Sequence, residues 1–328
     1  MNNVKARIRQ YKKIFQWILA FVCLCYIVLF FCKNRDSLKV IFSLDFVAIA
    51  YLVLFYTIGL ILQCYRYVVV IRKCSGSKIP FIRWFRIFIL GTFLSKIIPQ
   101  AGNIYRSVCL KKDFHVSYTS YISSYVSFAW LDTTLNLIIA LIVVLIFNPS
   151  LRIGNLKAYH LILFLAVLAA VIPFTLNIIC TFLESRIKYF SWLHSKVSEV
   201  LRVSVSNVRD GIYIARIGLT GMLSFINVMI IFYVCFRSLG VQVELPVLTL
   251  FFVILKLSNQ LVITPGNLGV RELAYGILGE LANIGMAQAI LASVIFRIVG
   301  TILVFALGLL FGGFNLLRKR DNYTCDES

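Results

Sequence analysis

The sequence predicts an all-α, polytopic membrane protein that forms a single transmembrane domain over residues 1–328. Hydrophobic residues make up 60% of the chain and charged residues 14%, whereas ordinary soluble proteins are only ~45–50% apolar. The apolar residues gather in runs long enough to cross a bilayer core, which takes ~20 helical residues. The net charge of +20 lies mostly between these runs, as expected of cytoplasmic loops. A membrane protein is therefore favoured over a nucleic-acid-binding protein, the other common interpretation of a basic chain.

About six apolar runs are predicted to be full transmembrane helices. The first, 14–32, follows a basic stretch and is too long for the core of a cleaved signal peptide, so the N-terminus is expected to be cytoplasmic. The others occupy residues 44–64, 118–147, 160–182, 219–236 and 287–310. The basic, amphipathic segment 183–216 is predicted to be a cytoplasmic connection that holds a helix on the membrane surface.

Residues 245–281 are apolar but interrupted, so they predict a broken helix. Pro265 and Gly269 stop the helix, because proline removes a backbone donor and glycine lets the chain turn. Two opposite charges, Arg271 and Glu272, follow directly. Irregular backbone at membrane depth is tolerated only where protein covers it or water fills a cavity. Ionisable residues there are costly and point to a functional site.

A weaker copy of this pattern lies in residues 81–110. Pro99 and Gly102 supply the break and Arg106 the following charge. The preceding segment, 65–86, is rich in arginine and lysine and is expected to be cytoplasmic. Paired helix breaks in the two halves of a chain indicate the binding site of a transporter.

The distribution of charge predicts how the two broken segments are oriented. The basic C-terminal run can be cytoplasmic only if 245–281 enters and leaves on the outer side and 81–110 on the inner side. The two segments are then re-entrant hairpins of opposite orientation, with Pro99 and Pro265 near tips that meet in a shared pocket. The predicted location is the cell membrane, inner or plasma, with both termini cytoplasmic.

These motifs together resemble one known family. They are the P-x-x-G-x-x-x-R pattern at 99–106, Asp132 in the following span, the run PGNLGVRE at 265–272, and Arg297 in the last span. The chain resembles the lysylphosphatidylglycerol synthase transmembrane region, a flippase-like family of integral membrane proteins. The resemblance implies a region that moves lipid between leaflets. In the bifunctional members that lipid is aminoacylated phosphatidylglycerol, made by a cytosolic domain. The present chain is expected to be a stand-alone member without that domain.

The candidate substrate-binding residues surround the two breaks. Arginine binds a lipid phosphate bidentately, so Arg271 and Arg106 are the candidates for holding it. The full set is Arg271, Glu272, Arg106, Asn267, Gly269, Pro265, Pro99 and Gly102. Two alternatives stay open: Arg271 and Glu272 belong to a structural ion network with Asp132 or Arg297, and Arg106 sits at the inner interface.

Asp132 and Arg297 are candidates for an ion pair or for proton coupling. Asp132 is expected either to carry a proton or cation or to pair with Arg297 within the bilayer. Lys256 is predicted to extend to the outer surface. Asn259 and Gln260 are predicted to hydrogen-bond across helices.

No catalytic arrangement is recognisable, so we expect a protein that is not an enzyme. The sequence has no nucleophile–base pair and no nucleotide-binding loop. Its nine cysteines form no CxxC motif and its three histidines are scattered, so no cofactor or metal is expected.

The leading hypothesis is a translocase for an anionic or glycosylated lipid, with a membrane phospholipid or glycolipid as its partner. The alternative is a non-transporting scaffold or accessory subunit for cell-envelope glycolipid or polysaccharide synthesis, which binds glycosyltransferases or lipid-modifying enzymes. A membrane-embedded transferase is the least favoured. Oligomeric state is left open, and no nucleic-acid partner is expected.

Overall fold

The computed structural model describes residues 45–76, 78–98, 100–186, 191–260, 264 and 267–312, together with Cys25. The first predicted span, the basic C-terminal run, Pro99 and Pro265 lie outside these residues. Within them the fold is helical except for one short hairpin, in which β1 (Arg152–Ile153) pairs antiparallel with β2 (Leu156–Lys157).

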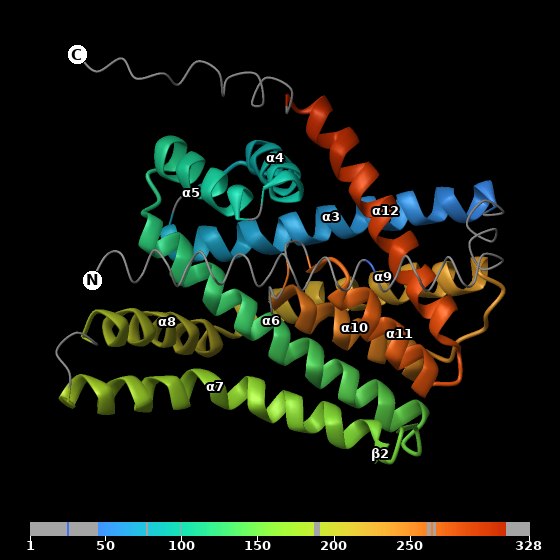
Figure 1. Cartoon of the computed structure of the whole chain (residues 1–328). Coiled ribbons are helices and arrows are strands. Elements are labelled where there is room, and N and C mark those ends of the chain that lie inside the picture. The colour runs from blue at the N-terminus through green and yellow to red at the C-terminus, as the bar shows by residue number, and fades with distance from the viewer. Residues whose placement is uncertain are drawn as a thin grey trace.

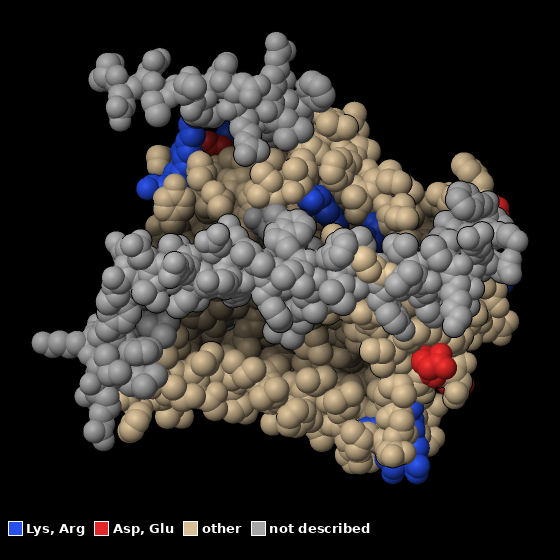
Figure 2. Space-filling view, in the orientation of Figure 1, with Lys and Arg blue, Asp and Glu red and all other residues tan. Residues whose placement is uncertain are grey.

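Five of the described helices are long and apolar enough to cross a membrane. They correspond to the second to sixth predicted spans: α3 (Phe46–Ser75), α6 (Tyr118–Phe147), α7 (Ala158–Arg186), α9 (Gly211–Ser238) and α12 (Met286–Leu310). Large apolar side chains such as Phe164 and Ile178 on α7 point outward. Charged side chains are sparse on the described surface that faces the viewer in Figure 2. An apolar outer surface of this kind needs lipid as its solvent.

Helix α3 is longer than the sequence predicted. It continues to Ser75 instead of ending at Cys64, and Gly76 then stops it in the left-handed conformation at φ 65°. The helix carries Arg66 into the interior, where the side chain is 3% exposed. The predicted end of this helix at Cys64 is therefore wrong, because a distant carboxylate compensates the charge of Arg66. The cytoplasmic location of 65–86 stays a prediction.

Both predicted helix interruptions are present. The first broken segment consists of α4 (Phe81–Ile97) and α5 (Ala101–Phe114), and Gln100 between them has φ 69°. The second consists of α10 (Leu245–Gln260) and α11 (Val270–Leu281). Each pair is antiparallel: Arg106 of α5 returns to the backbone carbonyl of Phe88, and the ring of Tyr275 packs on Phe251 at 5.2 Å.

The chain ends of these elements gather at two opposite ends of the bundle. At one end, the amide of Asn148 after α6 lies 3.4 Å from the carboxylate of Glu244 before α10. At the other, Lys73 of α3 pairs with Asp210 before α9 at 2.8 Å. Arg86 near the start of α4 donates to the Phe311 carbonyl at the end of α12. This arrangement fits the predicted opposite entry of the two broken segments, while the number of membrane crossings stays a prediction.

Helix α8 (Ser191–Arg209) lies within the predicted connection 183–216. It packs along α7 and α6 (Figure 1). Ser204 of α8 donates a hydrogen bond to Ser127 of α6 at 2.9 Å. The structure thus places this helix against the bundle, and its position relative to the membrane surface stays a prediction.

The buried core is aromatic where the broken segments meet the long helices. Phe232, Phe251 and Tyr275 are fully buried between α9, α10 and α11. On the other side, Gly308 of α12 lets the Phe93 ring of α4 approach its backbone, and a Cβ there would stand 2.6 Å from that ring. Small residues at such a crossing let two helices pack closely.

Candidate functional site

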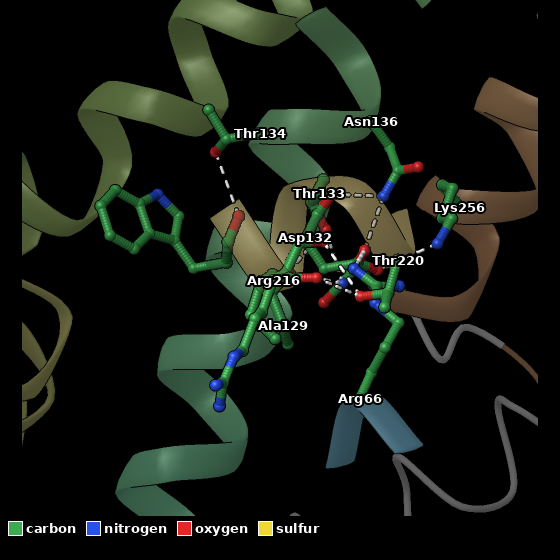
Figure 3. A network of polar contacts seen from close by, with 12 residues as sticks. Arg66, Ala129, Asp132, Thr133, Thr134, Asn136, Arg216, Thr220 and Lys256 are labelled. Atoms are coloured by element: carbon green, nitrogen blue, oxygen red, sulfur yellow. Dashed lines mark hydrogen bonds and ion pairs between the residues drawn. The ribbon is translucent and has the colours of Figure 1, made fainter. Parts of the chain in front are cut away.

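Asp132 is the centre of the first charged cluster, which we call the Asp132 cluster: Arg66, Asp132, Asn136 and Lys256. Arg66 of α3 forms an ion pair with one carboxylate oxygen of Asp132. Lys256 of α10 approaches the other oxygen at 2.9 Å, and Asn136 donates to the carboxylate at 2.6 Å. Figure 3 shows Arg66 and Lys256, from two other helices, pointing toward Asp132 of α6. Two cations share one carboxylate here, so the cluster keeps a net positive charge.

The Asp132 cluster also holds the second broken segment against α6. Lys256 lies one turn before Gln260, the last residue of α10. The Gln260 amide donates to the Thr133 hydroxyl at 2.7 Å. Helix α10 is therefore fixed to α6 immediately before the break, and the prediction that Gln260 hydrogen-bonds across helices is confirmed.

Two sequence predictions are corrected at this cluster. Asp132 is a buried ion-pair partner, but its partners are Arg66 and Lys256 and not Arg297. Lys256 turns inward to this carboxylate instead of extending to the outer surface. Both corrections have the same physical reason. A carboxylate inside the bundle stabilises a cation within reach more than the membrane–water interface would.

Glu272 is the centre of a second cluster, the Glu272 cluster: Arg271, Glu272, Ser293 and Arg297. Arg297 of α12 approaches one carboxylate oxygen of Glu272 through both Nη2, at 2.7 Å, and Nε, at 2.8 Å. Glu272 is only 4% exposed. Its other oxygen accepts the backbone N–H of Gly269 at 2.9 Å, which caps the first turn of α11. The network with Arg297 considered from the sequence is present.

The same contacts fix the backbone of the second break. Arg297 donates to the Asn267 carbonyl at 3.1 Å, and the Asn267 amide donates to the Ser258 carbonyl of α10. Asn267 has φ 51° and Gly269 has φ 80°, so the chain turns through the left-handed region at both. Asn267 and Gly269 therefore shape the turn.

Arg271 is held less firmly than its neighbour Glu272. Its guanidinium lies 3.8 Å from the Glu272 carboxylate, beyond hydrogen-bond distance. Its Nε is buried and has no hydrogen-bond partner among the described residues. The guanidinium carbon stands 5.7 Å from the centre of the Phe296 ring. Arg271 thus retains donors for a ligand, while Glu272 and Arg297 are occupied with each other.

Arg106 is buried in the first broken segment, at 8% exposure, and so does not lie at a water-exposed interface. Its guanidinium donates to the Thr92 hydroxyl at 2.7 Å and to the Phe88 carbonyl at 3.2 Å. Its Nε has no partner, and among the described residues no carboxylate pairs with it. A buried guanidinium held only by neutral groups is costly unless an anion joins it.

Glycines make room for Arg106. A Cβ on Gly91 would stand 2.7 Å from its Nε, and one on Gly102 would collide with the Gly91 carbonyl and the Ser95 hydroxyl. The sequence pattern identified Gly102 as a break residue, and the structure gives it a role in the close crossing of α4 and α5.

Sequence reasoning missed Arg66 and Lys96. Arg66 lies in what the sequence predicted to be a loop, and only the apolar run that continues beyond it, 67–71, could have indicated a buried position. Lys96 lies in the last turn of α4, with its ammonium 3.5 Å from the Thr301 hydroxyl of α12. A lysine three residues before a helix-breaking proline was the available signal.

The fold and these clusters define a class of protein, a multi-pass helical membrane protein with two interrupted helices and buried cations beside them. The chain belongs to the family of the lysylphosphatidylglycerol synthase TM region, whose model matches residues 15–308. This membership confirms the resemblance and links the chain to lipid handling. Comparison with curated proteins and with solved structures gives no match.

Proposed function

We propose that this protein is a lipid translocase that moves a lipid with an anionic headgroup, glycosylated or not, between the two membrane leaflets. The observation that carries the proposal is an excess of buried and half-buried positive charge. Among the described residues, the three sites hold five cations and two carboxylates: Arg66 and Arg106 are buried, Lys256, Arg271 and Arg297 are half-buried, and the carboxylates are those of Asp132 and Glu272. Buried charges need partners, and an anionic headgroup supplies the missing negative charge.

The positions of Arg271 and Arg106 support a binding role for both. Each follows the break of an antiparallel helix pair, and each has a buried Nε without a hydrogen-bond partner among the described residues. A guanidinium offers paired donors that match two oxygens of a phosphate. The helix N-terminus of α11, where Arg271 lies in the first turn, adds the positive end of its dipole.

The proposed mechanism needs no chemistry on the lipid. The headgroup exchanges its water shell for guanidinium donors, while the acyl chains stay in the surrounding lipid. We infer that the protein acts as a carrier and not as an enzyme, and that movement is passive or driven by an ion gradient.

A reconstituted assay tests the proposal. Purified protein in liposomes with fluorescent phosphatidylglycerol, or with a fluorescent anionic glycolipid, should expose inner-leaflet label to a reducing quencher. Arg271→Gln should slow the exchange about ten- to hundredfold, the equivalent of one or two charge-assisted hydrogen bonds. Arg237→Gln, on an exposed arginine in the last turn of α9, is the matched control and should exchange at the wild-type rate.

Two outcomes would contradict the proposal at different levels. Wild-type exchange in Arg271→Gln would remove Arg271 from the site. If the wild-type protein moves neither lipid, the translocase is rejected and the non-transporting scaffold takes its place.

A further inference from the structure

The first broken segment contacts α12 at Lys96. Its ammonium lies 3.5 Å from the Thr301 hydroxyl. Thr301 follows Arg297 by four residues on α12, so the two side chains lie on one face of that helix, about 6 Å apart along its axis. Lys96 of α4 therefore stands about one helical turn from the guanidinium that binds Glu272.

The charges that act on Lys96 at this contact are positive. The nearby charges that act most on its ammonium are those of Arg297 and Arg271, both of the same sign. Among the described residues no carboxylate forms an ion pair with it. Lys96 of α4 thus adds a third positive charge beside the two arginines, from α11 and α12, that stand at Glu272.

A lysine in a membrane helix usually extends to the nearest aqueous surface. Lys96 lies in the last turn of α4, whereas Arg86 near the other end of that helix contacts the end of α12. The bundle end where α4 begins is thus about the length of the helix away from Lys96. The side chain packs on Thr301 in the middle of α12, so snorkelling to that end does not account for its position.

We propose that Lys96 is the third cation of an anion site that both broken segments form with α12, and that this site takes a headgroup with two negative charges, a phosphomonoester or a diphosphate. This inference rests on the proposed function, because it names the substrate class of the Arg271 site. Lys96, Arg271 and Arg297 together exceed Glu272 by two charges. A ligand that matches this excess is preferred over one with a single charge, because each additional ion contact adds Coulomb attraction.

Binding to the purified full chain in a neutral detergent tests the inference. The probes are dioctanoyl phosphatidic acid, a phosphomonoester that is mainly dianionic at a pH above about 7 because its second pKa is about 6, and dioctanoyl phosphatidylglycerol, a monoanionic phosphodiester. Glycerol phosphate is the soluble probe that separates a lipid headgroup from a free phosphate. Dissociation constants are measured by thermophoresis for each variant.

The wild-type protein should bind phosphatidic acid about tenfold more tightly than phosphatidylglycerol, which is about 1.4 kcal/mol and close to the Coulomb energy of one additional ion contact in water. Lys96→Gln should reduce this preference to near parity and leave binding of phosphatidylglycerol almost unchanged. Lys96→Arg should keep the preference. Lys112→Gln, on an exposed lysine in the last turn of α5, is the matched control and should also keep it.

A preference for phosphatidic acid that survives in Lys96→Gln would overturn the inference, as would a wild-type protein that binds neither lipid. Equal affinity for glycerol phosphate would support the site and identify a free phosphomonoester as a ligand. Failure of the proposed function is distinguishable: if Lys96→Gln alters the binding preference while the wild-type protein moves no lipid in liposomes, the site stands and the translocase does not.

Discussion

At the scale of single residues, charged side chains at the two breaks have two different roles. Some stabilise the turn, and others keep hydrogen-bond donors available for a ligand. Glu272 accepts from Arg297 and from the Gly269 amide and so stabilises the turn. Arg271, its neighbour in sequence, keeps a buried Nε without a partner among the described residues. Adjacent residues on a helix point about 100° apart, which lets one carboxylate face α12 while the arginine beside it faces the site.

Replacing Glu272 should test its structural role. Glu272→Gln leaves Arg297 and Arg271 without a counter-charge, and breaking a buried ion pair costs about 3–5 kcal/mol. We expect a clearly lower midpoint in thermal unfolding of the detergent-solubilised protein. Glu280→Gln, on the exposed carboxylate of the same helix that accepts only from the Met286 amide, should change the midpoint little. Similar midpoints for the two variants would contradict the role assigned to Glu272.

The Asp132 cluster predicts unequal effects of its members. Asp132→Asn leaves both Arg66 and Lys256 unpaired and should destabilise by about 3–5 kcal/mol. Lys256→Met removes one cation but keeps the ion pair with Arg66, so the loss should be smaller. Chemical denaturation of both single variants and the double variant measures the coupling. An additive double variant would show that the contact between Lys256 and Asp132 contributes nothing.

At the scale of elements, the first broken segment depends on close contact between α4 and α5. Gly102 of α5 meets the Gly91 carbonyl of α4 with no room for a methyl group. The proline that precedes this contact explains why the helix stops, whereas the glycines explain how the two halves pack after it. Arg106 occupies the space that Gly91 leaves, so the glycines and the arginine form one unit.

Alanine substitution separates this packing role from the general cost of changing a glycine. Gly102→Ala should displace α5 from α4, lower the thermal midpoint and disturb the position of Arg106. Gly218→Ala in α9 meets nothing within 4 Å and should be neutral or slightly stabilising, because alanine is the better helix former. A midpoint for Gly102→Ala equal to that of Gly218→Ala would show that the crossing can relax.

The start of α9 offers a test by pH. Hydrogen bonds from Lys73 and from the Tyr213 amide lower the pKa of Asp210, which caps this helix outside the membrane-spanning part. A lowered pKa in the folded state gives stability that is present above the usual carboxyl pKa of about 4 and lost as the pH falls through the folded value. The wild type should therefore be more stable than Asp210→Asn at neutral pH, with a difference that shrinks below pH about 4. Thermal midpoints across that range measure it, and a constant difference would contradict the ion pair.

At the scale of the whole molecule, the loops between the described helices lie at two ends of the bundle. The two ends differ in their number of basic residues. The end with Asn148 and Glu244 carries few basic residues, namely Arg152, Lys157 and Arg237. The end with Lys73 and Asp210 carries many, including Arg72, Lys78, Arg83, Arg86, Lys111, Lys112, Arg202 and Arg209. From the positive-inside rule we predict that the second end is cytoplasmic.

Thiol labelling in whole cells checks this orientation. A membrane-impermeant maleimide should label Asn155→Cys in the turn between β1 and β2, and Gln242→Cys before α10, in intact cells. Lys112→Cys at the end of α5 should be labelled only after permeabilisation. The parent chain with its native cysteines gives the background. The reverse pattern would invert the topology, and labelling of Asn155→Cys without Gln242→Cys would separate two positions that the structure places at one end.

Much of the fold was predictable because it depends on local composition. The interruptions near Pro99 and Pro265 and the five described spans follow from apolar runs and helix breakers, which act within a few residues. The ion-pair partners of the charged residues could not be predicted in this way. Arg66 and Asp132 are 66 residues apart in the sequence, and Asp132 and Lys256 are 124 residues apart. No local pattern encodes such pairs.

The sequence alone determined the class of the protein, its spans, its family and the places where two helices break, because hydrophobicity and proline act locally. Only the tertiary structure decided which cations are compensated. It assigned Arg297 to Glu272 and Lys256 to Asp132, left Arg106 without a carboxylate among the described residues, and brought Lys96 to the face of α12 that holds Arg297. The reason is physical, since the energy of a buried charge depends on what surrounds it in space and not on its neighbours in the chain.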